Sequence, residues 1–180
     1  MLPTRLVHFG AMAELRMVRL MAEPITADAW APFGWLPVAD TDPADGAHTL
    51  TFEWGDPHLN VIAHEYGEVE HTEHGAICDR VYRHATHTQA LMVLNCDAIV
   101  AVAPASEPFT DGTGIDAVRA FVLHPQDVFV LHQGTWHWGP FPIGPDPVRL
   151  LNVQGLRYAE DNDCCVLAET IGTVAEVVRR

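Results

Sequence analysis

Residues 127–141, DVFVLHQGTWHWGPF, are the part of the chain from which its fold is best deduced. An apolar run at 128–131 predicts a short strand that ends on His132, and the Gln-Gly pair after it predicts a tight turn. His137 then lies between two tryptophans, before a Gly-Pro pair closes the segment. Two imidazoles and two indoles around one turn indicate a functional site.

A second histidine-rich segment, residues 82–89 with the sequence YRHATHTQ, lies upstream at the edge of another apolar run. Residues two apart on a strand face the same side, so Tyr82 and His84 are expected to share one face. Our central hypothesis is that this segment and residues 127–141 meet inside one barrel. In that arrangement His84 and His137 point toward each other.

The composition restricts the classes of protein to consider. The chain has 180 residues, 48% of them hydrophobic, which suits one domain with a sizeable core. Its formal net charge of −14 argues against nucleic acid and against an anionic membrane as partners, because both bind basic patches. No apolar run approaches the roughly 20 residues that cross a bilayer. The expected partner is a small-molecule substrate.

The N-terminal region and the cysteines bear on the location of the protein in the cell. Residues 1–15 are expected to be a leader or a strand extension, and residues 16–180 a single domain. The sequence shows no secretory signal and no CxxC pair, so its cysteines are interpreted as reduced thiols in a cytoplasmic protein. These cysteines are Cys78, Cys96, Cys164 and Cys165.

Short segments with strand-like patterns are spread along the chain, with Gly-, Pro- and Asp-rich turns between them. Besides the segment quoted first, the predicted strands are residues 15–21, 48–54, 59–66, 77–84, 90–94, 97–104, 118–123 and 148–153. Thr26 or Asp28 is a suitable cap for a short helix, and residues 166–180 are expected to end in another. So many short strands predict an all-β barrel or sandwich with one or two short helices.

The two histidine-rich segments match the spacing of the two cupin motifs but not all of their ligands. Those motifs resemble H-x-H-x4-E and P-x-G-x-x-H, and they point their metal ligands into a β-barrel. Here the first spacing reads Tyr82, His84 and Gln89, and the second ends on His137. The pattern therefore predicts a cupin-like antiparallel β-barrel, or jelly roll. No cofactor is certain; a divalent metal ion is the one to consider, with His84, Gln89 and His137 as its ligands.

The chain also resembles a known family. Residues 82–91, YRHATHTQAL, are similar to the pattern E-R-H-P-x-G-x-Q-A-F of the ureidoglycolate lyases, also called ureidoglycolate hydrolases, which have a cupin fold. Residues 128–138 are similar to the family's V-x-x-H-x-x-x-W-H-H-P, and residues 25–34, ITADAWAPFG, to its L-T-x-E-A-F-A-P-F-G. The resemblance covers most of residues 16–180 and implies a cupin domain there.

The resemblance implies an activity and a set of site residues. The family releases urea from ureidoglycolate to leave glyoxylate, in purine breakdown. A base removes the hydroxyl proton and an acid protonates the departing nitrogen, and imidazoles suit both roles. The implied catalytic residues are His84, His137, Gln89 and His132, and the implied substrate contacts are Tyr82, Arg83, Trp136 and Trp138.

Departures from the family pattern keep other functions open. Tyr82 stands where the family has Glu, and Trp138 stands where it has a second His. The alternatives are a metal-assisted cupin enzyme acting on another small polar substrate and a non-catalytic ligand-binding cupin. Arg83 faces away from His84 on a regular strand, so a salt bridge suits it as well as a substrate contact does. A homodimer is expected from an exposed strand edge and from the family resemblance.

Overall fold

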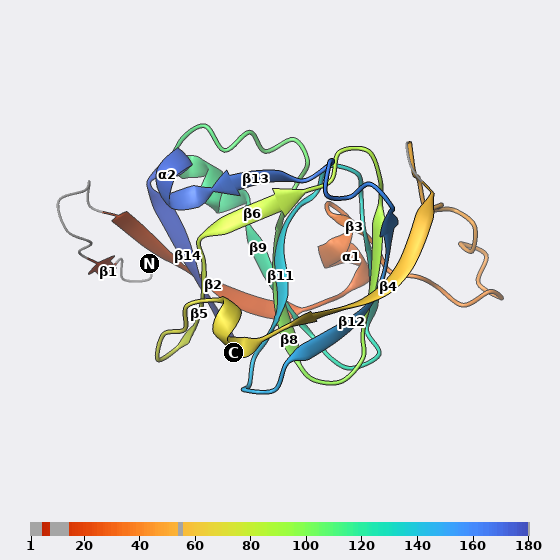
Figure 1. The fold of residues 1–180 in the computed structure, drawn as a ribbon, viewed down its shortest axis with the longest axis horizontal. Helices are drawn as coiled ribbons and strands as arrows, with labels where there is room; N and C mark the ends of the chain where they lie inside the picture. The colour runs from red at the N-terminus through yellow and green to blue at the C-terminus, as the bar shows by residue number, and fades with distance from the viewer. Residues whose placement is uncertain (1–4, 8–14, 54–55, 180) are drawn as a thin grey trace.

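The computed structural model describes residues 5–7, 15–53 and 56–179 (Figure 1). The expectation of a leader or strand extension at residues 1–15 falls largely outside these ranges. Of that segment, β1 (Arg5–Val7) pairs antiparallel with β2 (Leu15–Pro24). Within the described ranges, no helix is both long enough and apolar enough to cross a membrane.

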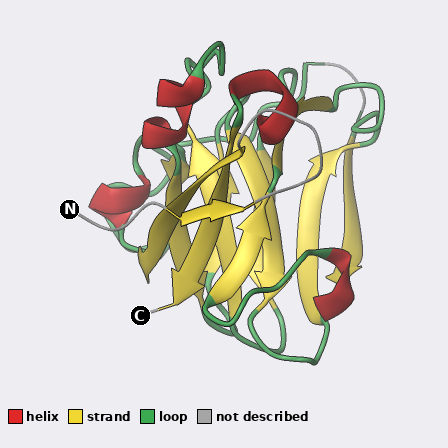
Figure 2. Cartoon of the chain, turned by 90° about the vertical axis from the view of Figure 1, so that its left-hand side faces the viewer, coloured by secondary structure: helices red, strands yellow, loops and turns green. Residues whose placement is uncertain are grey.

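Two curled sheets make up the structure (Figures 1 and 2). The nine-stranded sheet includes β1, which pairs only with β2. Its other strands follow in the order β13 (Asp163–Val166), β6 (Arg80–Arg83), β11 (Trp136–Pro142), β8 (Ala98–Ala103), β9 (Arg119–Leu123), β2, β14 (Thr173–Arg179), β5 (Gly75–Cys78). The five-stranded sheet has the order β3 (Gly34–Trp35), β10 (Val128–Leu131), β7 (Gln89–Val93), β12 (Val148–Gly155), β4 (Pro57–His64). The helical segments are α1 (Ala27–Trp30), α2 (Leu167–Ile171), and the 3-10 turns η1 (Tyr66–Glu68) and η2 (Gly112–Ala117).

The predicted all-β fold with a few short helices is confirmed. Paired strands are antiparallel except that β2 lies parallel to β14 and to β9. The two sheets share one apolar interior, to which β8 and β9 of the larger sheet and β7, β10 and β12 of the smaller one contribute. This is the cupin-like arrangement that the motif spacing predicts.

An aromatic cluster fills the centre of that interior. Trp30 of α1 is fully buried, and its indole meets the rings of Phe121 and Phe129 edge-on, with centroids 5.2 and 5.3 Å away. Its Nε1 donates a hydrogen bond to the main-chain oxygen of Val130 at 2.9 Å. Helix α1 begins where the sequence predicts, because the Thr26 hydroxyl accepts from the main-chain N–H of Ala29. The helix thus joins both sheets.

A second apolar cluster covers the other face of the nine-stranded sheet. It contains Trp136 and Trp138 of β11, Val81 of β6 and Leu167 of α2. Side chains alternate along a strand, so His137 between the two tryptophans faces the barrel interior instead. Its strand partner Val102 belongs to the interior cluster, which agrees with this direction. The described cysteines are free thiols, as expected.

Three strand predictions are wrong in part. Residues 48–53 form no strand and make only one bridge, from Phe52 to His87, because the main chain there bonds to the loop at 86–88; residue 54 lies outside the described ranges. Residues 77–84 divide at Asp79 into β5 and β6, which pair with different strands. The helix expected at the end of residues 166–180 lies instead near the start of that segment, as α2, and residues 173–179 form β14, because pairing of β14 with β2 and β5 overrides local preference.

Trp30→Ala is expected to lower the free energy of unfolding by about 3–5 kcal/mol, because it leaves a cavity between the sheets. Denaturation by urea, followed by circular dichroism, measures the loss. Trp30→Phe is the matched control, since it keeps an aromatic ring and leaves the main-chain oxygen of Val130 without its donor. We expect this control to lose only about 1–3 kcal/mol. An alanine variant as stable as the wild type would contradict the packing described.

Candidate active site

His84 and His137 reach the same place from neighbouring strands. Tyr82 of β6 pairs directly with His137 of β11, and His84 follows two residues after Tyr82. Residues paired across antiparallel strands, and residues two apart on one strand, project to the same face. The centroids of the two imidazoles are 5.3 Å apart, and both rings are buried. The predicted meeting of the two histidine-rich segments is confirmed.

A third imidazole, that of His87, completes the cluster. It stacks on His84 with the ring centroids 4.7 Å apart, and it is only 2% exposed. The turn between β6 and β7 carries His87 against Gly155 at the end of β12. A Cβ atom built on this glycine would lie 3.0 Å from Nδ1 of His87, so the close approach of ring and main chain favours glycine.

Each imidazole is held through its Nδ1 atom. Nδ1 of His84 lies 2.6 Å from the main-chain oxygen of Asp161, and Nδ1 of His137 lies 3.1 Å from that of Thr135. Nδ1 of His87 lies 3.2 Å from Oδ2 of the Asp161 carboxylate. Carbonyl and carboxylate oxygens accept hydrogen bonds, so each ring carries its proton on Nδ1 and keeps a lone pair on Nε2.

Burial keeps this histidine cluster (His84, His87 and His137) neutral. Desolvation lowers the pKa of His137 to about 3 and the pKa of His87 to about 4, and it also lowers the pKa of His84. The neighbouring His84 ring lowers the first two pKa values further, because two positive charges at this separation repel each other. At neutral pH the cluster therefore presents three lone pairs and no charge.

Asp161 fixes the geometry of the cluster. Its carboxylate accepts hydrogen bonds from the main-chain N–H groups of Ala85 and Thr86, at 2.9 and 2.7 Å, and from the Thr86 hydroxyl at 2.5 Å. Burial tends to raise the pKa of Asp161, but these hydrogen bonds and His87 outweigh it and leave the pKa lowered. The carboxylate is thus fully engaged in positioning the turn and His87.

The five-stranded sheet contributes a strip of carboxamides to the barrel interior. Nε2 of Gln89 donates to Oδ1 of Asn152 at 2.9 Å and to Oε1 of Gln154 at 3.3 Å. Asn152 donates in turn to Oδ1 of Asn60 on β4 at 2.8 Å. Oε1 of Gln89 and Nε2 of His87 are buried and have no hydrogen-bond partner among the described residues. Such atoms need a ligand or a water molecule.

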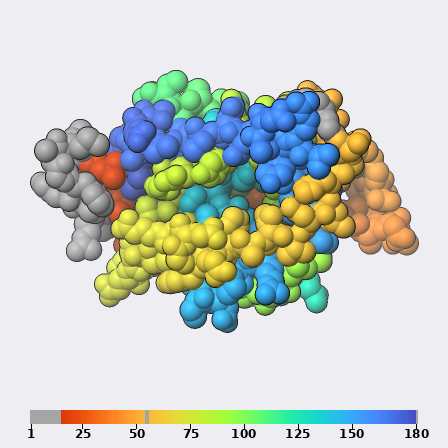
Figure 3. Space-filling view, in the orientation of Figure 1, coloured from red at the N-terminus to blue at the C-terminus, as the bar shows by residue number. Residues whose placement is uncertain are grey.

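A cavity of about 480 Å³ lies between β4, β6 and β11. Tyr82 and Trp138, two of the predicted substrate contacts, line it together with Arg80 and His64. In Figure 3 the teal atoms of β11 are recessed between β6, in yellow-green, and β4, in yellow. None of the three imidazoles lines this cavity; Tyr82, the strand partner of His137, lies between the cavity and the cluster.

Arg83 and Trp136 lie apart from the cluster. The Arg83 guanidinium lies 4.4 Å above the centroid of the Trp136 ring, and its Nε bonds to Asp163 at 2.9 Å. Strand alternation places both side chains on the opposite face of the sheet from His84 and His137. Their contact with a substrate stays a prediction, which this placement does not favour.

His132 also lies apart, in a different cavity. Its ring centroid is 5.3 Å from that of Trp35, which stacks in turn on His48, and all three line a space of about 370 Å³. The residue follows β10, where the chain turns back along β3. A catalytic role for His132 stays a prediction without support from its position.

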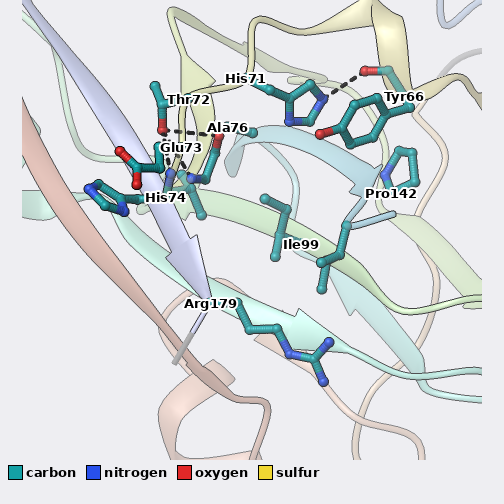
Figure 4. A pocket seen from close by; sticks show the side chains of 12 residues that line it. Tyr66, His71, Thr72, Glu73, His74, Ala76, Ile99, Pro142 and Arg179 are labelled. Carbon is teal, nitrogen blue, oxygen red and sulfur yellow. Dashed lines mark hydrogen bonds between the residues drawn. The ribbon is translucent and has the colours of Figure 1, made fainter. Parts of the chain in front are cut away.

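A smaller cavity of about 190 Å³, shown in Figure 4, lies beside η1 and β5. The rings of Tyr66 and His71 stack there with centroids 3.6 Å apart, and Nε2 of His71 bonds to the main-chain oxygen of Tyr66. The Thr72 hydroxyl donates to Glu176 at 2.5 Å. These polar groups are already paired with one another, so we do not place the active site here.

Comparison with known families decides which proteins this chain is related to. The family model described as ureidoglycolate lyase matches residues 17–173. The chain belongs to the ureidoglycolate lyase family. Membership in that family indicates an enzyme of the lyase type. A comparison with curated proteins finds no match.

Two solved structures are similar to this ureidoglycolate lyase family member. A dTDP sugar isomerase from Desulfovibrio desulfuricans G20 is 10% identical, with a TM-score of 0.41, over 94% of this chain and 85% of the isomerase. An L-ribose isomerase from Cellulomonas parahominis, solved with L-ribose, is 16% identical, with a TM-score of 0.42, over 77% of this chain and 70% of the isomerase. Likeness at this level carries no information about the reaction.

Part of the histidine cluster fits a divalent metal ion. Imidazoles that bind metals through Nε2 commonly donate their other N–H to an oxygen, as all three rings do here. Suitable atoms of His84, His87 and Asp161 lie within 4.8 Å of one another, but the Asp161 carboxylate is engaged elsewhere. His87 is therefore a candidate ligand beside the predicted His84. His137, the other predicted imidazole ligand, does not belong to this group, and Oε1 of Gln89 remains without a partner among the described residues. When bound, such an ion would polarise a substrate oxygen.

Several site residues of this ureidoglycolate lyase family member escaped the sequence argument. Asn152 and Gln154 stand two residues apart in β12, where they alternate with Leu151 and Val153, so the period of two was the signal that could have identified them. Asn60 stands between Leu59 and Val61 of β4 in the same way. The role of Asp161 had no such signal. It depends on a loop contact 77 positions away, between Asp161 and His84.

Stability is expected to fall as the pH is lowered from 7.5 to 5. The folded pKa values of His87 and His137 are depressed, so below about pH 6.5 the unfolded chain binds protons that the folded chain refuses. Each ring contributes a loss of about 2 kcal/mol over this interval. Urea denaturation at several pH values measures it. In His137→Gln the free energy of unfolding should fall by only about half as much over this pH interval. An unchanged pH dependence would contradict the lowered pKa of His137.

Metal binding is expected to depend on His87. Titration of protein purified without a histidine tag with Zn²⁺ or Co²⁺, followed by calorimetry or by the visible absorption of Co²⁺, should give binding near one ion per chain. His87→Gln should weaken it by 10-fold or more, because it removes a ligand. His124→Gln, which changes an exposed histidine paired with Asp97, is the matched control and should bind as the wild type does. Wild-type affinity in His87→Gln would exclude His87 as a ligand.

Proposed function

We propose that this protein cleaves the C–N bond of ureidoglycolate, or of a closely related carbinolamine, and releases urea and glyoxylate. Membership in the ureidoglycolate lyase family supports the lyase class. The single observation that carries the proposal is the contact between the His84 and His137 rings inside the barrel, 5.3 Å apart. In this proposal the protein is a cytoplasmic enzyme of purine breakdown.

The chemistry needs one proton to move from oxygen to nitrogen. Nε2 of His137 accepts the hydroxyl proton of the substrate, while its Nδ1–H stays bonded to the main-chain oxygen of Thr135. The oxygen lone pair then forms the carbonyl double bond of glyoxylate, and the electron pair of the C–N bond leaves with the ureido nitrogen. That nitrogen takes the proton from the imidazolium, so the ring returns to its neutral form as urea departs.

The lowered pKa of His137 suits the second step more than the first. An imidazolium with a pKa near 3 is a strong acid and gives up its proton readily to the departing nitrogen. The neutral ring is a correspondingly weak base. His84, whose Nδ1 is bonded to the main-chain oxygen of Asp161, supplies a second Nε2 lone pair that accepts a hydrogen bond from the substrate.

The carboxamide strip is suited to a ureido group. A urea moiety presents N–H donors and a carbonyl acceptor, and amide side chains match both kinds of atom. Oε1 of Gln89 is buried and unpartnered, so it is available to accept from a ureido N–H. Its Nε2 is already held by Asn152 and Gln154, which fixes the direction of that oxygen. Binding of a neutral ureido group therefore requires no additional charge in the interior.

The substrate carboxylate needs a cation, and Arg80 is better placed than Arg83 to provide one. Arg80 lies on the same face of β6 as Tyr82, and both line the cavity of about 480 Å³. Its Nε and Nη2 donate to the Asp79 carboxylate at 2.7–3.2 Å, and its partly exposed guanidinium offers its remaining N–H groups to a substrate carboxylate. We assign to Arg80 the role that the family resemblance implied for Arg83.

A metal-assisted reaction on another small polar substrate is the second candidate. The specific observation in its favour is the set of three Nε2 lone pairs on neighbouring, uncharged imidazoles. One nitrogen of His84 and one of His87 lie within 4.8 Å of each other, which suits a shared cation. Stoichiometric metal in protein purified without a histidine tag, together with no release of urea, would favour this candidate over the first.

The purified protein is expected to release urea from ureidoglycolate faster than the spontaneous reaction does. His137→Ala should lower kcat by about 100-fold or more, because it removes the proposed proton acceptor. Urea and glyoxylate are measured together, since the proposed reaction forms them in equal amounts.

The matched control for this test is His124→Ala. It removes an exposed imidazole outside the cavity and should keep wild-type activity. Circular dichroism checks that both variants fold. Release of urea no faster than in buffer alone would retire ureidoglycolate as the substrate, and full activity in His137→Ala would retire the mechanism.

A further inference from the structure

A further histidine, His58, faces the barrel interior from β4. Along this strand Asn60 bonds to Asn152 of β12, and Ile62 packs against the interior cluster, so both point inward. Residues two apart on a strand share one face, which places His58 on the inner face as well. Its partner across the sheet is Gln154 of β12, and Figure 1 shows the two strands side by side on the right. His58 therefore continues the carboxamide strip by one more position.

The Nε2 atom of His58 is buried and has no hydrogen-bond partner among the described residues. The same is true of Oε1 of Gln89, whose amide nitrogen donates to Oε1 of Gln154, the strand partner of His58. Two unpartnered atoms thus come from the two neighbours of one carboxamide. Buried polar atoms in native proteins are nearly always paired, because an unpaired one loses its hydration without compensation. These two atoms indicate a bound molecule that pairs with both.

The order of the strands decides how such a molecule lies. β7 carries Gln89 and β4 carries His58, and the two strands lie on either side of β12. Neighbouring strands are roughly 4.8 Å apart, so the main chains of these two residues are separated by about 10 Å. Both side chains extend into the interior. A small molecule that lies across Gln154 therefore meets both.

One turn connects His58 to the histidine cluster. The Tyr158 ring lies parallel to the His58 ring, with the two centroids 6.1 Å apart. Three residues later, the main-chain oxygen of Asp161 holds Nδ1 of His84 at 2.6 Å. The main-chain N–H of Asp161 also donates to the main-chain oxygen of Arg157 at 3.3 Å, which tightens the turn. Three residues span at most roughly 11 Å, so His58 and His84 border the same end of the barrel.

The atoms at this place match one part of the proposed substrate. A carboxamide oxygen accepts hydrogen bonds, and so does Nε2 of an imidazole whose proton is on Nδ1. The site therefore offers two acceptors to a group that carries N–H donors. In the proposed reaction, His137 and His84 engage the hydroxyl group and the departing nitrogen. The terminal amino group of the ureido moiety remains, and its two N–H bonds match Oε1 of Gln89 and Nε2 of His58.

We propose that His58 is a specificity residue, whose Nε2 accepts a hydrogen bond from the terminal amino group of the substrate. The inference rests on the proposed lyase function and adds to it the residue that selects a ureido group over a simple amide. An amide substrate has a carbon atom at the place of the terminal nitrogen, so it leaves Nε2 of His58 buried and unpaired. A site built around a hydrogen bond rejects such an analogue strongly.

Kinetics with two substrates test the proposal. Ureidoglycolate is compared with 2-acetamido-2-hydroxyacetate, which has a methyl group in place of the terminal amino group and releases acetamide and glyoxylate. Glyoxylate formation gives kcat and KM for both. His58→Phe keeps a ring beside Tyr158 and should lower kcat/KM for ureidoglycolate by about 10-fold, chiefly through KM. For the acetamido substrate it should change kcat/KM by no more than about 2-fold, because no hydrogen bond is lost.

A rescue variant and a matched control accompany this measurement. His58→Gln offers a side-chain oxygen that accepts the same hydrogen bond, so it should recover most of the lost kcat/KM for ureidoglycolate. His124→Phe makes the first replacement at an exposed histidine paired with Asp97 and should match the wild type on both substrates. Equal losses on both substrates in His58→Phe would show a structural role and overturn the proposal. Wild-type values on both substrates would overturn it as well.

Binding of ureidoacetate separates this inference from the reaction on which it rests. This molecule lacks the hydroxyl group and is not cleaved, but it keeps the terminal amino group. Calorimetry should show that the wild type binds it about 10-fold more tightly than His58→Phe does. If the wild type forms no urea from ureidoglycolate and this difference persists, the lyase reaction is wrong and the role of His58 in binding stands. Equal affinities, or no binding to either protein, would overturn the role of His58.

Discussion

The register between β6 and β11 is the constraint on which the rest of the site depends. Tyr82 opposite His137 sets which side chains of both strands face the barrel interior, and a shift by one residue would send His137 outward and bring Trp136 and Trp138 in. The apolar clusters on the two faces of the nine-stranded sheet oppose such a shift. Each tryptophan of β11 belongs to the outer cluster, and Val102, the partner of His137 on β8, belongs to the inner one. Packing on both faces therefore holds the His137 imidazole in position.

Given that register, the local hydrogen bonds decide what the imidazoles can do. Main-chain and carboxylate oxygens hold the three Nδ1 atoms, and burial keeps the rings neutral, so the interior presents proton acceptors and ligand atoms instead of positive charge. A buried neutral cluster of this kind suits a proton transfer within one substrate, and it also suits a bound cation. It offers no positive charge to pair with the carboxylate of a substrate. This is the physical reason for assigning the carboxylate to Arg80 at the cavity wall and the ureido group to the carboxamides.

Strand β4 shows how the alternation of side chains connects two properties of the molecule. Its inward residues continue the carboxamide strip from Asn152 through Asn60, while its outward residues, Leu59 and Val61, are exposed to solvent. One strand thus forms part of the wall of the interior and also the edge of its sheet, where it pairs with β12 on one side.

The sequence by itself determined the all-β architecture, most strand positions, the start of α1, and the pairing of His84 with His137, because period-two patterns, turn residues and motif spacing are local signals. It misassigned residues 48–53 and the order of elements after residue 166, since strand partners there lie far away in the chain. Only the tertiary structure decided that His87 joins the cluster and that His132, Arg83 and Trp136 do not. These positions depend on a loop contact from Asp161, on the close approach of Gly155 and on the direction of each side chain across a sheet, which no local pattern records.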